Sequence, residues 1–409
     1  MKRFVSIVII IFVLFACSPS TELEFSNSRI KPEVTATKLN PTATKTRVSD
    51  TSTAIPIWAT KTPVLTATEI VSREEQELAA FPLSGRGPYW TGNRKFTFVD
   101  ESRAGREIHV TIRYPALKQT DADGNFITRD AVPDMSAAPY PLILTDGDAG
   151  DHLFQSHLVS HGFAMAIIYF PYKEKWDFEV FDRPRDYLFV LDQIASLPLE
   201  GLDGVIDSDH VGSAGYSWGG FYSQALSGVR IDPEYYLSFC EQAPAEELEL
   251  SEWYLEYVCN LAQNWDEFAA YVGDEITASE DGLWQPLTDE RIRAVMPMAE
   301  YGTWLYGKRG LAMADRPMLI IAPTEDEYIP YAETAYFFEY VGSSERYLIS
   351  FIGLGHMMVE TPKYANRINH FATAFFGYYL QGRDDNAAYF SEDFVSQFDD
   401  LAWGVYSDD

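Results

Sequence analysis

The segment Gly215–Gly219, of sequence Gly-Tyr-Ser-Trp-Gly, constrains the fold of this chain more than any other part of its sequence. A short run of small and apolar residues precedes it at 211–214, and a segment with helical character follows it at 220–226. Glycines on both sides of Ser217 allow a tight crossing from strand to helix, which larger residues would block. The pattern therefore predicts a buried strand that ends at an exposed serine. A serine hydroxyl needs a base within hydrogen-bonding distance to act as a nucleophile, and the rest of the chain must supply it.

The first 16 residues have the features of an export signal. Lys2 and Arg3 precede an apolar run from Phe4 to Ala16, which is too short to span a membrane as a mature helix. The sequence Leu-Phe-Ala-Cys that ends at Cys17 resembles a bacterial lipobox, in which the cysteine is acylated and becomes the mature N-terminus. An ordinary secretory signal and an uncleaved N-terminal anchor are the alternatives. All three predict export, and lipidation predicts a bacterial membrane lipoprotein that faces the extracytoplasmic side.

Residues 17–75 have the composition of a tether. They are dominated by Thr, Pro, Ser and Ala with scattered charges, and they show almost no apolar periodicity. Such a segment cannot bury a core, and its prolines keep it partly extended. We therefore expect it to hold a folded domain, residues 76–409, away from the membrane surface.

Charge and cysteine content restrict the partners of the protein. The formal net charge is −30, from 61 acidic and 31 basic residues, and no basic stripe interrupts it. This excess repels nucleic acid and anionic lipid headgroups, so membrane attachment rests on the N-terminal lipid. With Cys17 acylated, Cys240 and Cys259 remain as an even pair in an oxidising compartment. They form either a disulfide or two buried thiols.

Residues 76–409 alternate between strand and helix patterns. The segments 96–99 and 108–114 have period-two alternation and predict an antiparallel opening pair. Later apolar runs are nearly continuous, as in parallel strands that are covered on both faces, and helical segments separate them. The pattern predicts an α/β fold with a mostly parallel, doubly wound sheet. The predicted parallel strands are 142–145, 164–169, 211–214, 292–298, 318–322 and 347–351, and the predicted helices are 153–160, 185–197 and 364–380.

Residues 229–289 interrupt this alternation. The segment is acidic, aromatic and helical in pattern, and it contains no good strand. An insertion after a central helix lies above the carboxyl edge of the sheet, where ligands bind in such folds. We interpret it as a helical cap over the site of Ser217. The alternative is a packing subdomain that lies away from the chemistry.

The base and the acid are expected after the later strands. In serine hydrolases built on this kind of sheet, the nucleophile, acid and base follow one another in the chain. His356 lies in a glycine-rich turn directly after the strand at 347–351, so it is the predicted base. Asp326 lies in the loop that follows the strand at 318–322 and is the predicted acid. Glu300, at the end of the preceding strand, is the alternative acid.

A metal site is not expected. His157 and His161 share a helix face at i, i+4 spacing, which can hold zinc. No carboxylate or third histidine accompanies them at ligand spacing, so we interpret both as surface residues. The chemistry predicted for Ser217 requires neither a metal nor an organic cofactor.

These motifs together resemble the α/β-hydrolase superfamily. Within it, the chain is similar to dienelactone-hydrolase-like esterases and their relatives, the platelet-activating-factor acetylhydrolases and bacterial polyester hydrolases. Dienelactone hydrolase itself uses a cysteine nucleophile, so Ser217 favours esterase chemistry. The matching stretches span about Phe96 to Leu380, and they are 141–147, 215–219, 289–295, 324–330 and 355–356.

The resemblance also implies an oxyanion hole. In these relatives it is formed by backbone N–H groups, which correspond here to Asp148 and Trp218. The chain departs from the relatives at Asp146, where they carry histidine before the glycine. Two aspartates beside a developing anion are electrostatically unfavourable, which makes this loop atypical.

The sequence thus predicts an exported, membrane-tethered serine hydrolase that cleaves carboxylic esters through an acyl-enzyme intermediate. A small or lipid-like substrate is expected from the aromatic residues near Ser217, which include Trp218, Phe221, Tyr301 and Trp304. A peptidase or amidase on the same fold is one alternative. A binding lipoprotein without catalytic activity is the other.

Overall fold

The computed structural model describes residues 75–118, 127–147, 154–170, 178–242, 252–300 and 302–407. The chain divides into two units, Met1–Pro63 and Val64–Asp409, and all the described residues belong to the second. The predicted signal, Cys17 and the predicted tether up to residue 74 therefore lie outside the described residues. Among the helices that are described, none is long and apolar enough to cross a membrane.

A ten-stranded sheet forms the centre of the described part, in the order β10-β9-β8-β7-β6-β4-β5-β2-β1-β3. The neighbours from β5 to β9 pair in parallel, whereas β2 pairs antiparallel with both β1 and β5. The predicted mostly parallel sheet and its antiparallel opening pair are therefore confirmed. The strands are β1 (Trp90–Asp100), β2 (Arg106–Ala116), β3 (Ile127–Arg129), β4 (Tyr140–Asp146), β5 (Ala164–Tyr169), β6 (Ile206–Tyr216), β7 (Ile292–Met298), β8 (Met318–Pro323), β9 (Arg346–Phe351) and β10 (Leu401–Trp403).

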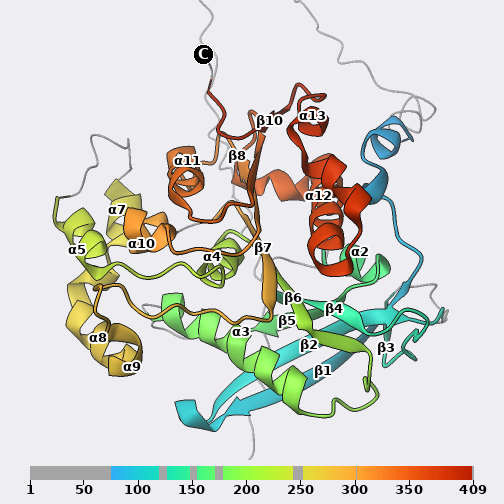
Figure 1. The fold of residues 1–409 in the computed structure, drawn as a ribbon, viewed down its shortest axis with the longest axis horizontal. Coiled ribbons are helices and arrows are strands. Elements are labelled where there is room, and N and C mark those ends of the chain that lie inside the picture. Colours follow the sequence, from blue (N-terminus) through green and yellow to red (C-terminus); the bar gives the residue numbers. More distant parts are fainter. Residues whose placement is uncertain are drawn as a thin grey trace, which may run out of the picture. The chain divides into compact units, whose positions relative to one another are not determined.

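Helices cover both faces of this sheet (Figure 1). Successive side chains of a strand point to opposite faces, so Ala164 and Ala166 of β5 join one core cluster and Met165 joins the other. The nearly continuous apolar strands require this double cover. The first cluster includes side chains of α3 (Glu179–Ser196), α4 (Trp218–Ala225), α10 (Thr303–Leu311) and α11 (Tyr331–Tyr340), and the second includes side chains of α2 (Gln155–Ser160) and α12 (Pro362–Gln381).

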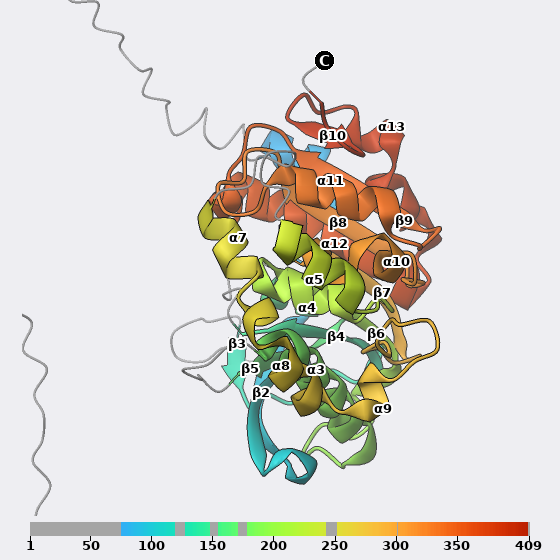
Figure 2. The same ribbon diagram turned by 90° about the vertical axis from the view of Figure 1, so that its left-hand side faces the viewer.

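The described part of the insertion is helical, as the sequence predicts. Its elements are α5 (Pro233–Gln242), α7 (Glu252–Val258), η3 (Leu261–Asn264), α8 (Trp265–Val272) and α9 (Asp274–Thr277). Figure 2 shows these helices on the side of α3, α4 and α10. Phe268 of α8 stacks on Phe178 with ring centroids 5.5 Å apart, and Tyr236 of α5 lies 5.4 Å from Trp304. Helices α5 and α8 therefore form an outer packing layer, while α7 reaches the site described below.

Of the two states that the sequence left open for Cys240 and Cys259, the structure contains the disulfide. Cys240 in α5 and Cys259, directly after α7, are joined by a disulfide. The hydroxyl of Tyr236 also donates to the carbonyl of Val258 at 3.0 Å. The carboxyl end of α7 is thus fixed to α5 by a covalent bond and a hydrogen bond.

Candidate active site

Ser217 lies at the turn between β6 and α4. Its backbone has φ 57° and ψ −117°, a region that non-glycine residues rarely adopt. A Cβ atom on Gly215 would lie 2.2 Å from the carbonyl oxygen of Gly219, and one on Gly219 would lie 2.3 Å from Oδ1 of Asp146. The close crossing of strand and helix therefore excludes side chains at both glycines. The predicted strand, turn and helix are confirmed, although Ser217 is half-buried rather than exposed.

Two hydrogen bonds connect Ser217 to the predicted base and acid. Oγ of Ser217 lies 3.1 Å from Nε2 of His356, and Nδ1 of the same ring lies 2.7 Å from Oδ2 of Asp326. The three side chains come from the ends of β6, β9 and β8, which share one edge of the sheet. A proton on Nδ1 shared with Asp326 leaves Nε2 able to accept the hydroxyl proton. The sequence analysis named all three residues.

The imidazole is held by further contacts that the sequence did not predict. The backbone N–H of His356 donates to Oε2 of Glu327 at 2.9 Å. The backbone carbonyl of His356 accepts a hydrogen bond from the hydroxyl of Tyr216 at 2.5 Å. The bond from His356 lowers the pKa of Glu327. The ring of Tyr328 packs edge-on against the imidazole at 5.2 Å. His356 is 7% exposed, so its orientation is fixed by burial as well as by these partners.

Asp326, rather than Glu300, makes the bond to His356. Oδ1 of Asp326 also accepts the backbone N–H groups of Tyr328 and Ile329 at 2.9 and 2.8 Å, so both of its oxygens have partners. Glu300 lies after β7 and is 1% exposed, with its Cβ close to Gly220 of α4. Burial raises its pKa to about 8, so the carboxyl is mostly neutral at pH 7. Glu300 is therefore a buried packing group beside the nucleophile helix.

The structure describes one of the two expected oxyanion donors. Trp218 is the first residue of α4, and first-turn N–H groups of a helix have no carbonyl acceptor four residues earlier. This places the N–H of Trp218 at a helix N-terminus, which favours negative charge. Asp148 lies outside the described residues. Asp146 is 1% exposed, and its carboxylate lies against Gly219.

An aromatic contact links the insertion to the residue after Ser217. The ring of Tyr257 in α7 lies 5.9 Å from that of Trp218. Of the other aromatic residues that the sequence analysis named, Phe221 and Trp304 are 0% and 4% exposed and belong to the first core cluster, so neither ring is open to a ligand in this structure. Tyr301 lies outside the described residues.

The interpretation of His157 and His161 as surface residues was wrong. Nε2 of His157 lies 2.9 Å from the carbonyl oxygen of Leu83, and Nε2 of His161 lies 2.8 Å from that of Gly85. Both rings are thus hydrogen-bonded to backbone carbonyl groups of the segment that precedes β1. In the part of the chain that the structure describes, there is no group of three potential metal ligands.

No protein-family model matches this chain, and no curated protein matches it in sequence. The fold and the site therefore have to define the class of this protein. It is an α/β protein in which a serine on a strained strand-to-helix turn is hydrogen-bonded, through a buried histidine, to an aspartate.

Proposed function

We propose that this protein is a serine hydrolase of the α/β-hydrolase fold that cleaves carboxylic esters. The observation that carries the proposal is the continuous hydrogen-bonded path from Ser217 through His356 to Asp326. The sheet order, with the three residues at the carboxyl ends of β6, β8 and β9, supports it. Each residue then has a defined role.

Ser217 Oγ attacks the ester carbonyl carbon, and its proton passes to Nε2 of His356. The carbonyl oxygen becomes an oxyanion, which backbone N–H groups of Trp218 and Asp148 stabilise. When the tetrahedral intermediate collapses, the bond to the alcohol breaks and Nε2 returns the proton to the leaving oxygen. Water then attacks the acyl-enzyme with the same imidazole as base, which releases the carboxylic acid and restores Ser217.

Apolar side chains around the site favour an ester with an apolar part. Tyr328 and Met357, which flank Asp326 and His356 in the sequence, are 46% and 49% exposed. Trp218 and Tyr257 form an aromatic pair on the side of the insertion. Large exposed apolar groups beside a nucleophile are typical of sites that bind apolar ligands.

A peptidase or amidase and an inactive binding lipoprotein are the competing functions. The intact hydrogen-bonded path argues against an inactive protein, since binding alone does not require it. The first experiment is labelling with a fluorophosphonate, which reacts with activated serines. Ser217→Ala should abolish labelling, whereas the exposed control Ser396→Ala should retain it. Equal labelling of wild type and Ser217→Ala would overturn the assignment.

The reaction class needs a second experiment. We expect hydrolysis of p-nitrophenyl esters by the wild-type protein, with no comparable turnover of peptide anilides. Turnover of the anilides at a similar kcat/KM would favour a peptidase or amidase. If the wild-type protein hydrolyses neither the esters nor the anilides but is still labelled by the fluorophosphonate, Ser217 is activated and acts on another class of substrate.

Export and lipidation at Cys17 belong to the same proposal. The protein should partition into the membrane fraction and require detergent for extraction, and Cys17→Ser should release or mislocalise it. A mature N-terminus that is an unmodified residue other than Cys17, shown by mass spectrometry, would contradict lipidation.

A further inference from the structure

The acid and the base of the candidate site lie on two loops that are hydrogen-bonded to each other. The loop at 324–327 follows β8 and carries the acid, and the loop at 353–356 follows β9 and carries the base. We call these two segments the acid–base loops. A Cβ atom on Gly355 would lie 2.6 Å from Oε2 of Glu327, so the loops are closely packed. Their hydrogen bonds, each 2.9 Å long, run from the N–H of Gly353 to Oγ1 of Thr324, from the N–H of Glu325 to the carbonyl of Leu354, and from the N–H of His356 to Oε2 of Glu327.

The nucleophile turn belongs to a different part of the sheet. Ser217 directly follows β6, and β7 separates β6 from β8 and β9. Among the described residues, two hydrogen bonds cross from this turn to the acid–base loops, and both end on His356. One is the contact between Oγ of Ser217 and Nε2. The other runs from the hydroxyl of Tyr216 to the backbone carbonyl of His356.

The Tyr216 hydroxyl is a fixed donor. The side chain is buried, and its ring lies 5.4 Å from the imidazole of His356. Burial, together with the nearby carboxylates of Asp326 and Glu327, raises the pKa of Tyr216 well above its ordinary value. The phenol therefore keeps its proton and donates it to the carbonyl. Removal of the hydroxyl would leave a buried carbonyl without this partner.

The contact between Ser217 and His356 does not last through the proposed reaction. Once Oγ is bonded to the acyl carbon, it has no proton to donate to Nε2. In that state Nε2 must hold and deprotonate a water molecule instead. The Tyr216 hydroxyl touches no reacting atom, so its bond to the backbone carbonyl remains in the acyl-enzyme. It is then the crossing hydrogen bond that keeps His356 aligned with the acyl group.

We propose that Tyr216 is a positioning residue for His356, and that deacylation depends on its hydroxyl more strongly than acylation does. The proposal rests on the proposed serine hydrolase activity. Tyr216 acts through the backbone of His356, whereas Asp326 acts through the ring. A shift of a catalytic group by about 1 Å can cost about 10²-fold in rate, so the loss of one anchor has a measurable effect.

An aryl carbamate measures the two steps separately in the full chain. When p-nitrophenyl dimethylcarbamate reacts with Ser217, the release of p-nitrophenol reports acylation. The carbamoyl group leaves slowly, so the return of fluorophosphonate labelling after removal of the reagent reports deacylation. In Tyr216→Phe, which keeps the ring, the rate of return should fall about tenfold or more, whereas the rate of acylation should fall less than about threefold.

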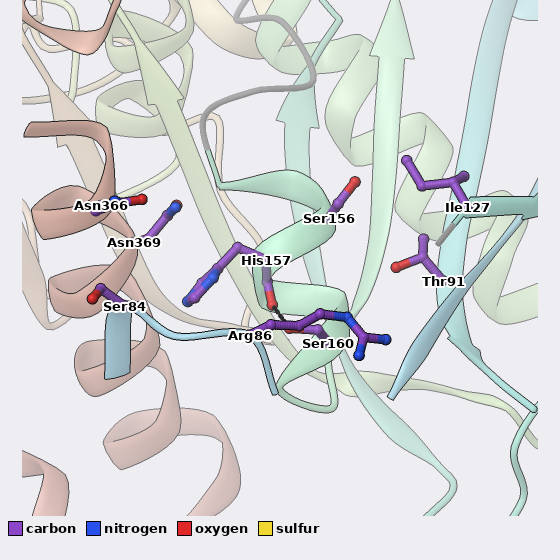
Figure 3. A pocket seen from close by; sticks show the side chains of 9 residues that line it. All are labelled: Ser84, Arg86, Thr91, Ile127, Ser156, His157, Ser160, Asn366 and Asn369. Carbon is purple, nitrogen blue, oxygen red and sulfur yellow. Dashed lines mark hydrogen bonds between the residues drawn. The ribbon is translucent and has the colours of Figure 1, made fainter. Parts of the chain in front are cut away.

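Two matched controls each remove a buried hydroxyl that donates to a backbone carbonyl elsewhere. Tyr140→Phe acts at the amino end of β4, where the phenol donates to Asp134 at 2.6 Å. Ser160→Ala removes a donor to the backbone carbonyl of another histidine, His157, at 2.7 Å (Figure 3). Both should leave the two rates as in the wild type, which separates loss of position from loss of stability.

The outcomes distinguish this proposal from the activity on which it rests. A wild-type protein that is neither carbamoylated nor labelled at Ser217 would remove the proposed hydrolase activity, and this proposal with it. A wild type that reacts, together with an unchanged rate of return in Tyr216→Phe, would overturn the role of Tyr216 alone. Equal slowing of both steps, or the same slowing in Tyr140→Phe, would also overturn it, because the hydroxyl would then support the fold and not deacylation.

Discussion

Asp326 and Glu327 are adjacent in sequence but bind different atoms of the same residue. Asp326 contacts the imidazole ring of His356, and Glu327 contacts its backbone N–H. The two N–H groups that donate to Oδ1 of Asp326 fix its carboxylate by a local turn. The chain order of hydrolase motifs could identify Asp326, but nothing in the local sequence indicated the role of Glu327.

Different effects are expected from removing these two carboxylates. Asp326→Asn should lower kcat by roughly 10³–10⁴, because an amide favours the wrong tautomer of His356. Glu327→Gln should lower it less than about tenfold, since an amide oxygen can still accept the N–H. Steady-state hydrolysis of a p-nitrophenyl ester measures both. A larger loss in Glu327→Gln than in Asp326→Asn would contradict the assignment of the acid.

Glu300 gives a prediction about stability. Burial raises its pKa to about 8, above the ordinary value of about 4.3. Between these pH values the folded state holds a proton that the unfolded state has lost, so this group makes the protein less stable as the pH rises. Glu300→Gln should therefore raise Tm relative to wild type, and by a larger amount at pH 8 than at pH 5. A difference in Tm that is the same at both pH values would contradict a neutral, buried Glu300.

At the scale of elements, α7 connects the insertion to the site. Its Tyr254 hydroxyl donates to Glu333 of α11, its Tyr257 contacts Trp218, and its end is fixed by the disulfide at Cys259. Glu333 also accepts the hydroxyl of Thr303 at 2.9 Å. These contacts hold α7 beside the nucleophile, while α8 packs on α3 and α5 packs on α10.

The aromatic contact of α7 should influence substrate choice. Tyr257→Ala removes the ring beside Trp218. The value of kcat/KM should therefore fall several-fold more for long-chain p-nitrophenyl esters than for p-nitrophenyl acetate. Tyr271→Ala, a change in α8 on the same insertion, is the matched control, because Tyr271 hydrogen-bonds Asp182 of α3 instead. Equal selectivity in wild type and Tyr257→Ala would show that the insertion serves packing alone.

The disulfide should matter for stability. Its cysteines are 19 residues apart, and closing a loop of that length contributes about 3 kcal/mol in the chain-entropy model. The double variant Cys240→Ser/Cys259→Ser should lose a comparable free energy of unfolding in urea titrations, with fluorophosphonate labelling of Ser217 retained. Two free thiols in the denatured, unreduced wild-type protein would contradict the bond.

The sequence predicted those elements whose signal is local. Apolar runs such as 164–169 gave β5, and the glycines around Ser217 gave the strand-to-helix turn. The three-residue strands β3 and β10 were not predicted, because so short a segment has no measurable periodicity and depends on pairing with distant strands. Helix α3 begins at Glu179 rather than at Arg185, since Pro184 lies inside the helix where the sequence suggested a boundary.

At the scale of the whole described unit, the segment before β1 is held by three histidines. His157 and His161 of α2 contact the carbonyls of Leu83 and Gly85, and Nδ1 of His370 in α12 accepts the N–H of Leu83 at 3.0 Å. Arg367 of α12 adds an ion pair with Glu77. These contacts join residues that are between 74 and 290 positions apart, so the sequence alone could not reveal them.

These histidines oppose the effect of Glu300 on the pH dependence of stability. Burial lowers the pKa of His370 to about 3, from an ordinary value of about 6.5. Between these values the unfolded state binds a proton that the folded state does not, so the contribution of His370 to stability is lost as the pH falls. The pKa of His157 is lowered in the same way, to about 3. In the wild type, the free energy of unfolding as a function of pH therefore combines two opposite trends, one from Glu300 and one from the histidines.

Comparison with a variant separates them. In His370→Asn the amide oxygen can occupy the position of Nδ1 and accept the N–H of Leu83, but it does not titrate. The free energy of unfolding of this variant, relative to wild type, should rise as the pH falls from 6.5 to 4.5, by up to about 1.4 kcal/mol per pH unit. Urea titrations at four pH values in this range measure it, and His157→Gln should show the same trend. A difference that does not depend on pH would mean that His370 is protonated equally in the folded and unfolded states, and that the contact with Leu83 does not exclude the proton.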